Sequence, residues 1–233
     1  MQRNILDRLL EARAAKRPAA HLRWLEAGDE ALVVAGEVVV GGPLPQPMLD
    51  AVRSAHRRDR GATIETERGP LFIQVFNPPL RLIVVGAVHI AQALVPMASL
   101  TGYDVTVVDP RRAFASDARF PGVAVRQDWP DEALEELRPD ARTAVVTLTH
   151  DPKLDDPALD VALRSEVFYI AALGSKRTHA ARRERLAGLG HDAAALDRIY
   201  GPAGLSIGAV SPAEIALSVM AEMTRVLRQG GNA

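Results

Sequence analysis

Glycine, histidine and acidic residues cluster in short segments that could bind an anion or transfer a proton. The first segment is Gly86-Ala87-Val88-His89-Ile90-Ala91. It resembles the G-x-G-x-x-G turn that binds the pyrophosphate of a dinucleotide through backbone N–H groups. Val88 occupies the place of the second glycine, and its β-branched side chain should obstruct a pyrophosphate. Tight binding of NAD(P) is therefore not expected, and we weigh equally a smaller phosphorylated ligand and a scaffold that binds no nucleotide.

The second segment, Asp109-Pro110-Arg111-Arg112, combines an acid with two arginines. Asp109 follows Gly86 at about the 20-residue offset of an acid that binds ribose hydroxyls in dinucleotide-binding folds. Arg111 could bind a 2′-phosphate, as an arginine does in NADP-binding proteins. A solvated turn has the same composition, so both readings stay open for this segment.

The third segment contains Thr149, His150 and Asp151. His150 could donate to a ligand phosphate or act as an acid or base oriented by Asp151, and we favour ligand contact over catalysis. Further along the chain, Asp156 precedes Pro157 and is predicted to cap a helix over about 156–164, so the acids at 155 and 156 are not expected to bind metal.

The fourth segment is Gly174-Ser175-Lys176-Arg177. A glycine, a hydroxyl and two cations at the start of a helix can hold an anion through N–H groups and charge. Gly174 and Ser175 are the candidate contacts here. The segment is not a Walker loop, because the G-x-x-x-x-G-K-[ST] pattern is absent.

Composition excludes several kinds of chemistry. The chain has 233 residues, no cysteine and a formal net charge of −1, so it can contain no disulfide or thiol nucleophile and has no overall electrostatic attraction to nucleic acid or an anionic membrane. The six histidines show no H-x-H or H-E-x-x-H pairing, so we predict no metal site, and no catalytic residues are assigned. Without a signal-like apolar run or a stretch of about 18 apolar residues, the sequence favours a soluble cytoplasmic protein.

The elements that must position these segments alternate regularly after residue 80. Four apolar runs read as strands buried on both faces, and helical patterns separate or follow them, which is typical of a parallel sheet covered by helices. The expected strands cover about 81–85, 104–108, 144–149 and 167–173, with a weaker one at 123–126, and the expected helices cover 89–100, 131–138, 156–164 and 177–189. A final helix should begin at Ser211-Pro212-Ala213-Glu214, a capping box. The predicted fold class is α/β, a Rossmann-like doubly wound parallel sheet.

The N-terminal region has a different pattern. It predicts a smaller α+β domain with helices over about 3–17 and 47–58 and strands at 31–34, 37–40 and 71–76. The double proline of Asn77-Pro78-Pro79 is the best linker candidate, since proline restricts the residue before it. We therefore expect domains over residues 1–79 and 80–233.

The ordered combination of these segments resembles the xanthine dehydrogenase accessory family, XdhC/CoxI, over about residues 80–228. The resemblance rests on Val85 to Ala91, Val108 to Arg111, Arg119-Phe120-Pro121, Leu148 to Asp155, Ala172 to Ser175, Gly204 to Gly208 and Pro212 to Ala216. It implies a protein that binds molybdenum cofactor (molybdopterin) and delivers it to a molybdenum hydroxylase apoenzyme of the xanthine or carbon monoxide dehydrogenase type. It also implies a cysteine desulfurase partner that supplies sulfur to the cofactor. Carried across, the candidate ligand contacts are Gly86, His89, Asp109, His150, Gly174 and Ser175. The full set of predicted cofactor contacts also includes Ala87, Val88, Arg111, Thr149 and Asp151.

Two departures from the family pattern matter. Many members have Gly-Ala-Gly-His-Val-Gly where this chain has Val88 and Ala91, and their N-terminal domain typically carries a Gly-Gly-Cys segment where this chain has Gly41-Gly42 and no cysteine. The N-terminal domain therefore looks degenerate, and this chain cannot carry sulfur as a cysteine persulfide. An NAD(P)-dependent oxidoreductase or regulatory protein, and a ligand-free scaffold that acts through partner contacts, remain the alternatives. Association into a homodimer stays open.

Overall fold

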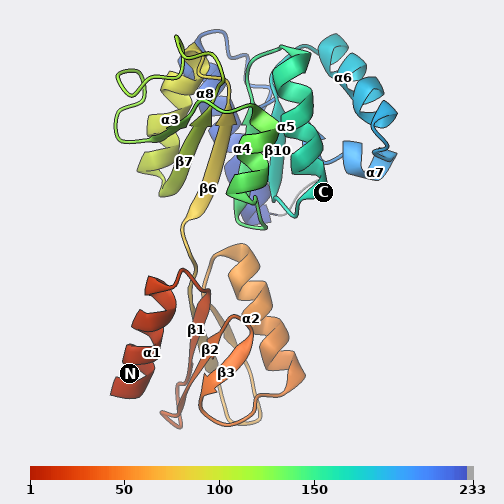
Figure 1. The fold of residues 1–233 in the computed structure, drawn as a ribbon. Helices are drawn as coiled ribbons and strands as arrows, with labels where there is room; N and C mark the ends of the chain where they lie inside the picture. The colour runs from red at the N-terminus through yellow and green to blue at the C-terminus, as the bar shows by residue number, and fades with distance from the viewer. Residues whose placement is uncertain (230–233) are drawn as a thin grey trace. The chain divides into compact units, whose positions relative to one another are not determined.

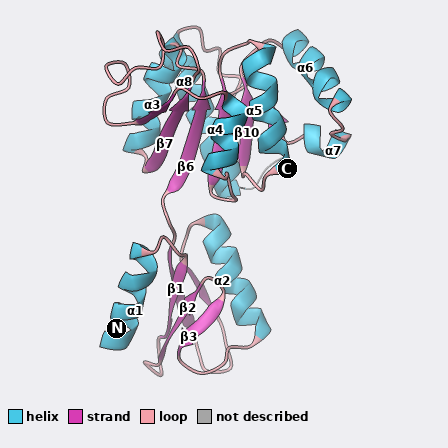
Figure 2. Cartoon of the chain, viewed as in Figure 1, coloured by secondary structure: helices cyan, strands magenta, loops and turns pink. Residues whose placement is uncertain are grey.

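The computed structural model describes residues 1–229, and the chain divides into two compact units, Met1–Pro78 and Pro79–Ala233. The division falls between the two prolines of the expected linker. Figure 1 traces the chain through both units, and Figure 2 separates helices from strands.

The N-terminal unit is a five-stranded antiparallel sheet with one helix on each face. The strands lie in the order β3-β2-β1-β5-β4. Their bounds are β1 Ala19–Trp24, β2 Glu30–Val34, β3 Glu37–Val40, β4 Ala62–Ile64 and β5 Leu71–Phe76. Helix α2 (Gln46–Arg58) packs Val52 and Ala55 into one core, and α1 (Arg3–Ala14) packs Ile5 and Leu9 into the other. The expected α+β class is therefore correct for this unit.

The sequence patterns missed β1, which pairs with both β2 and β5 and holds this sheet together. Its sequence, AAHLRW, lacks the β-branched residues that favour strands, so the local signal is weak. The short strand β4 was missed as well.

The C-terminal unit contains a six-stranded parallel sheet in the order β11-β10-β9-β6-β7-β8. Chain order starts in the middle at β6, moves outward through β7 and β8, and then crosses to β9, β10 and β11. This is the Rossmann strand order, and it places the topological switch point between β6 and β9. The strands are β6 Leu80–Val85, β7 Tyr103–Val108, β8 Ala124–Arg126, β9 Thr143–Thr147, β10 Tyr169–Ala172 and β11 Ile199–Tyr200. The predicted fold class is confirmed.

Helices cover both faces of this sheet (Figure 1). One core contains α3 and α8 against the even-numbered side chains of β6, including Leu82 and Val84. The other contains α4 and α5, with Leu186 and Leu196, against Ile83 and Val85. The helices are α3 His89–Leu100, α4 Pro130–Leu137, α5 Pro152–Arg164, α6 Lys176–Gly188, α7 Ala193–Leu196 and α8 Pro212–Gln229.

The start of α8 confirms the predicted capping box. The Ser211 hydroxyl accepts the Glu214 amide at 3.3 Å, and the Glu214 carboxylate accepts the amide of Ser211 at 2.8 Å. These reciprocal bonds satisfy N–H groups that the first turn of a helix leaves without partners.

The predicted start of α5 is wrong. The helix begins at Pro152, not at Pro157, and Asp151 is its cap, with its carboxylate accepting the Lys153 amide at 3.0 Å. Asp156 lies inside the helix, where it forms an ion pair with Arg185.

Candidate functional site

Four segments meet at the carboxyl edge of the parallel sheet. Val85 pairs in register with Val108 of β7 and Thr147 of β9, and Thr147 pairs with Ala172 of β10. The residues that follow these strands therefore emerge side by side. Ligands of open α/β sheets bind outside this edge, at the switch point.

The first segment turns sharply after β6. Gly86 has φ +110°, and a Cβ there would lie 2.7 Å from Cγ2 of Thr149. Glycine is therefore required both for the left-handed backbone and for contact with the third segment. Val88 has φ −91° and packs partly against the α3 and α8 core, so no special backbone conformation is needed at its position.

Helix α3 begins at His89 without a side-chain cap. The first N–H groups of a helix have no partner within the helix, and they carry the positive end of its dipole. His89 itself is exposed. An uncapped helix start at the switch point of a Rossmann sheet is suited to an anion.

Asp109 is fully buried, and its carboxylate is occupied by bonds within the protein. It accepts the Ala87 amide at 2.8 Å, the Arg111 amide at 3.0 Å, and a two-pronged bond from the Arg111 guanidinium at 2.9 and 2.7 Å. Burial alone would raise the pKa of Asp109, but these hydrogen bonds outweigh it and hold the pKa below its usual value. The acid expected to bind ribose thus fixes the first segment against the second.

A loop without a helix connects β7 to β8, and Arg119 ties it to the first segment. One guanidinium nitrogen of Arg119 donates to the carbonyl oxygens of Ala87, at 2.8 Å, and Phe114, at 2.9 Å. The other donates to Gln92 on α3 at 3.1 Å. Ala87 is consequently held through its N–H by Asp109 and through its carbonyl by Arg119.

The third segment is folded around Asp155, a residue for which the sequence suggested no role. Its carboxylate accepts the Thr149 hydroxyl at 2.6 Å and the His150 amide at 3.1 Å. These bonds hold His150 at φ +62° with its side chain exposed. Asp155 therefore sets the backbone path of the segment, while Asp151 caps α5.

Arg182 of α6 lies behind this segment, and its side chain is 1% exposed. It is 3.5 Å from the Asp155 carboxylate and donates to the Leu173 carbonyl at 2.9 Å, so it links the third and fourth segments. Burial raises the pKa of Asp155 above its usual value, even though the Thr149 hydroxyl and the Arg182 charge favour the carboxylate. Only the spatial proximity of α5 and α6 reveals this pair, so sequence reasoning had no signal for it.

In the fourth segment, Gly174 has φ +147° and Ser175 caps α6 by accepting the Thr178 amide at 3.1 Å. The Ser175 hydroxyl therefore serves the helix first, although the residue is exposed.

The structure thus brings all of the predicted contact residues to one edge of the sheet but uses their side chains in two ways. Asp109, Asp151 and Ser175 stabilise the segments themselves. His89 and His150 are exposed, and the Arg111 side chain is 39% exposed. Exposed cations surround the edge, namely Arg112, Lys153, Lys176 and Arg177.

None of the helices within residues 1–229 combines the length and apolar composition needed to cross a bilayer. In the same residues, no three His, Cys, Asp or Glu side chains gather closely enough to hold a metal ion.

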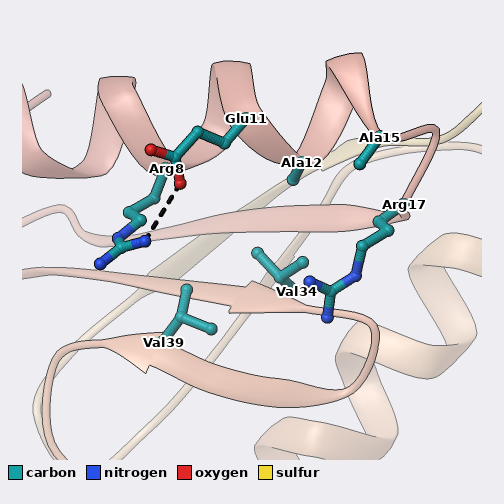
Figure 3. A pocket seen from close by; sticks show the side chains of 7 residues that line it. All are labelled: Arg8, Glu11, Ala12, Ala15, Arg17, Val34 and Val39. Carbon is teal, nitrogen blue, oxygen red and sulfur yellow. Dashed lines mark hydrogen bonds and ion pairs between the residues drawn. The ribbon is translucent and has the colours of Figure 1, made fainter.

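A separate hollow of about 470 Å³ lies in the N-terminal unit, between α1 and the β2–β3 hairpin (Figure 3). Arg8 pairs with Glu11 at 3.1 Å on its helical wall, and Arg17, Val34 and Val39 line the rest. The charges on its walls are mixed and partly paired, so we assign it no ligand.

A family model matches the C-terminal unit. Residues 82–223 match the family model of the XdhC Rossmann domain. The molybdenum cofactor insertion chaperone PaoD of Escherichia coli K12 is 34% identical over 151 residues, which is 65% of this chain and 41% of that protein. A protein of Bacillus subtilis 168 named as a probable xanthine dehydrogenase subunit is 33% identical over 160 residues, 68% of this chain and 46% of that protein.

A crystal structure described as a xanthine dehydrogenase from Bacillus halodurans has the same fold, with a TM-score of 0.70 and 26% identity. The alignment covers 97% of this chain and 65% of that one. The chain spans less than half the length of the two curated relatives described above. Since the match to the XdhC Rossmann domain extends over residues 82–223, more than half of the sequence, the chain belongs to the XdhC family.

Proposed function

We propose that this protein is an accessory factor for a molybdenum hydroxylase, and that it binds molybdenum cofactor and delivers it to the apoenzyme. The observation that carries the proposal is the uncapped start of α3 at the switch point, next to the exposed side chains of His89, His150 and Arg111. The name of the related chaperone from Escherichia coli supports the choice of cargo.

The donor groups at this edge fit a phosphate-bearing cargo. Molybdenum cofactor has a terminal phosphate, which the α3 N-terminus would hold through N–H groups and its dipole. His89, His150 and Arg111 would add charge-assisted hydrogen bonds, and Gly86, Ala87, Val88, Thr149 and Gly174 would provide the backbone surface. Asp109, Asp151 and Ser175 would act by keeping the segments in place.

Sulfuration of the cargo needs a partner in this proposal. The chain contains no cysteine and cannot form a persulfide, so a cysteine desulfurase would supply the sulfur while the cofactor is bound.

The proposal includes a cytoplasmic location and leaves room for a homodimer. Subcellular fractionation and analytical ultracentrifugation test these two points.

The experiment mixes the purified protein with molybdenum cofactor under anaerobic conditions and measures molybdenum that co-elutes on gel filtration. It then measures reconstitution of a xanthine dehydrogenase-type apoenzyme. A His89→Ala/His150→Ala variant should retain much less molybdenum. The matched control is His191→Ala, since His191 pairs with Asp160 at 2.7 Å and follows α6 rather than a strand of the sheet. Wild-type protein that neither retains molybdenum nor improves reconstitution would contradict the proposal.

An NAD(P)-binding protein is the second candidate, because the strand order and the uncapped α3 are shared with dinucleotide-binding folds. The engagement of Asp109 by Ala87 and Arg111 counts against it. Fluorescence titration with NADH and NADPH discriminates between the two. If the protein binds none of these ligands yet captures a hydroxylase, the result would favour the third candidate, a ligand-free scaffold that acts through partner contacts.

A further inference from the structure

An aromatic side chain and two guanidinium groups form a cluster beside the start of α3. The ring of Phe114 is 42% exposed. The guanidinium carbon of Arg111 lies 4.7 Å from the centre of this ring, and that of Arg119 lies 5.7 Å away. We call these three residues the Phe114 cluster.

Hydrogen bonds fix the cluster against the first segment. Arg111 is held edge-on by the buried carboxylate of Asp109, through its Nε and one terminal nitrogen. The same Arg119 nitrogen that binds the Phe114 carbonyl also binds the carbonyl of Ala87. Ala87 is two residues before His89, so the cluster lies directly beside the uncapped helix start.

The chemistry of the cluster suits a flat ring. Because Arg111 binds Asp109 through only its Nε and one terminal nitrogen, the flat faces of the group remain for stacking, and one of them covers Phe114. Heteroaromatic rings stack on aromatic side chains and on guanidinium planes. A single exposed aromatic residue is common on protein surfaces, but here the partly exposed ring contacts two guanidinium groups and lies next to a helix start suited to an anion.

We infer that the Phe114 cluster is the subsite for a planar heteroaromatic ring, in a ligand whose phosphate binds at the α3 N-terminus. The inference rests on the proposed function for the phosphate-binding part of the site. It adds a ring contact that would make the site bind phosphates with an attached ring more tightly than small phosphates without one. A purine and the flat aminopyrimidinone ring of a pterin share this chemistry. Under the proposed function the pterin is the better ligand.

The test uses three probes on the full chain, measured by isothermal titration calorimetry. They are 6-hydroxymethylpterin monophosphate, AMP and the ringless glycerol 3-phosphate. Phe114→Leu removes the aromatic ring but keeps an apolar side chain, and Phe114→Tyr keeps the ring as the matched control. Circular dichroism and urea unfolding check that both variants fold like the wild type.

Because the variant loses stacking on an aromatic side chain, Phe114→Leu should weaken pterin phosphate binding about tenfold, a change of about 1.4 kcal/mol. Glycerol 3-phosphate should bind both variants within about twofold of the wild type, a change of about 0.4 kcal/mol. Phe114→Tyr should retain most of the pterin affinity and the quenching of pterin fluorescence.

Equal effects of Phe114→Leu on ringed and ringless phosphates, or no effect on any probe, would overturn the ring subsite and leave the proposed function intact. A loss confined to AMP would support the subsite and contradict the proposed cargo. If the wild type binds none of the three probes, the ring subsite is overturned, and molybdenum retention on gel filtration decides the proposed function separately.

Discussion

Gly86 and Thr149 touch where β6 and β9 end, since a Cβ on Gly86 would lie 2.7 Å from Cγ2 of Thr149 and 3.3 Å from its amide nitrogen. The two segments that flank the switch point are thus packed with no room for a methyl group. The Thr149 hydroxyl also donates a hydrogen bond to Asp155 at 2.6 Å. A substitution at Gly86 that displaces Thr149 should therefore also displace His150, the residue after Thr149, without direct contact between Gly86 and His150.

Gly86→Ala should lower both stability and ligand binding. The variant combines a left-handed backbone, which costs about 1–2 kcal/mol in an L-residue, with an overpacked contact that costs about 1–3 kcal/mol. Gly102→Ala is the control, because Gly102 has φ +89° with open space around its missing Cβ. Urea unfolding should show a larger loss for Gly86→Ala, by about 2 kcal/mol. Equal losses would mean that Thr149 moves aside without cost.

Asp109→Asn should destabilise the C-terminal unit by about 3 kcal/mol, because the asparagine NH2 cannot accept the bonds that the buried carboxylate accepts from Ala87 and Arg111. The variant should also change how stability depends on pH. The folded pKa of Asp109 is lowered, so the unfolded state takes up the proton first as the pH falls. The stability from this group is complete above about pH 4, the usual pKa, and is lost as the pH falls through the folded value.

Urea unfolding between about pH 2.5 and 7 measures this effect. The wild type should lose stability more steeply than Asp109→Asn below about pH 4. Parallel pH profiles for the two proteins would show that Asp109 is not the group responsible.

The parallel sheet could be predicted from sequence because its strands are uniformly apolar. Buried strands such as Leu80–Val85 and the helix His89–Leu100 carry strong local patterns, and both were predicted within one residue. Strand β1 has no such pattern, and its two antiparallel neighbours fix it instead. Local composition therefore indicated the Rossmann unit better than the N-terminal one.

The start of α5 was predicted wrongly because the sequence contains two possible N-terminal caps for this helix. Asp-Pro occurs at Asp151-Pro152 and again at Asp156-Pro157, and either pair can cap a helix. Asp156 is used instead in a bond of 3.0 Å with Arg185, about thirty residues away in sequence. The ion pair with Arg185 therefore distinguishes Asp156 from Asp151, and the spacing of residues along the chain cannot reveal such a long-range contact.

The arrangement of the candidate site was only partly predictable for the same reason. Strand ends identify which residues reach the edge of the sheet. The strand ends do not show that the Asp109 carboxylate is hydrogen-bonded to Ala87 and Arg111, because these hydrogen bonds depend on the turn after β6.

Val88→Gly should not create tight dinucleotide binding. Two features support this expectation: Val88 packs partly into the core, and Asp109 is not free to bind ribose hydroxyls. The variant should instead lose about 1 kcal/mol of stability, from added chain entropy and lost packing. NADH and NADPH fluorescence titrations of both proteins measure the outcome. Micromolar binding that appears only in the variant would show that the valine alone was the obstacle.

The ion pair between Asp155 and Arg182 should be far more sensitive to substitution than the one between Asp156 and Arg185. The side chains of Asp155 and Arg182 are 2% and 1% exposed, whereas those of Asp156 and Arg185 are 11% and 40% exposed. Removing one partner of a buried pair leaves an uncompensated charge and costs about 3–5 kcal/mol. Exposed pairs contribute about 0–1 kcal/mol, and the loss from the half-exposed Asp156–Arg185 pair should lie between these two ranges. Arg182→Met should therefore destabilise strongly, and Arg185→Met is its matched control.

A double variant separates charge compensation from simple packing. In Asp155→Leu/Arg182→Met both buried charges are gone, so the loss should be smaller than the sum of the two single losses. The third segment should still lose its order, because Thr149 and His150 no longer have the carboxylate that binds them. Hydrogen exchange at the His150 amide should accelerate in the double variant and stay slow in Arg185→Met. Additive losses with unchanged exchange would show that Asp155 neither depends on Arg182 nor orders the segment.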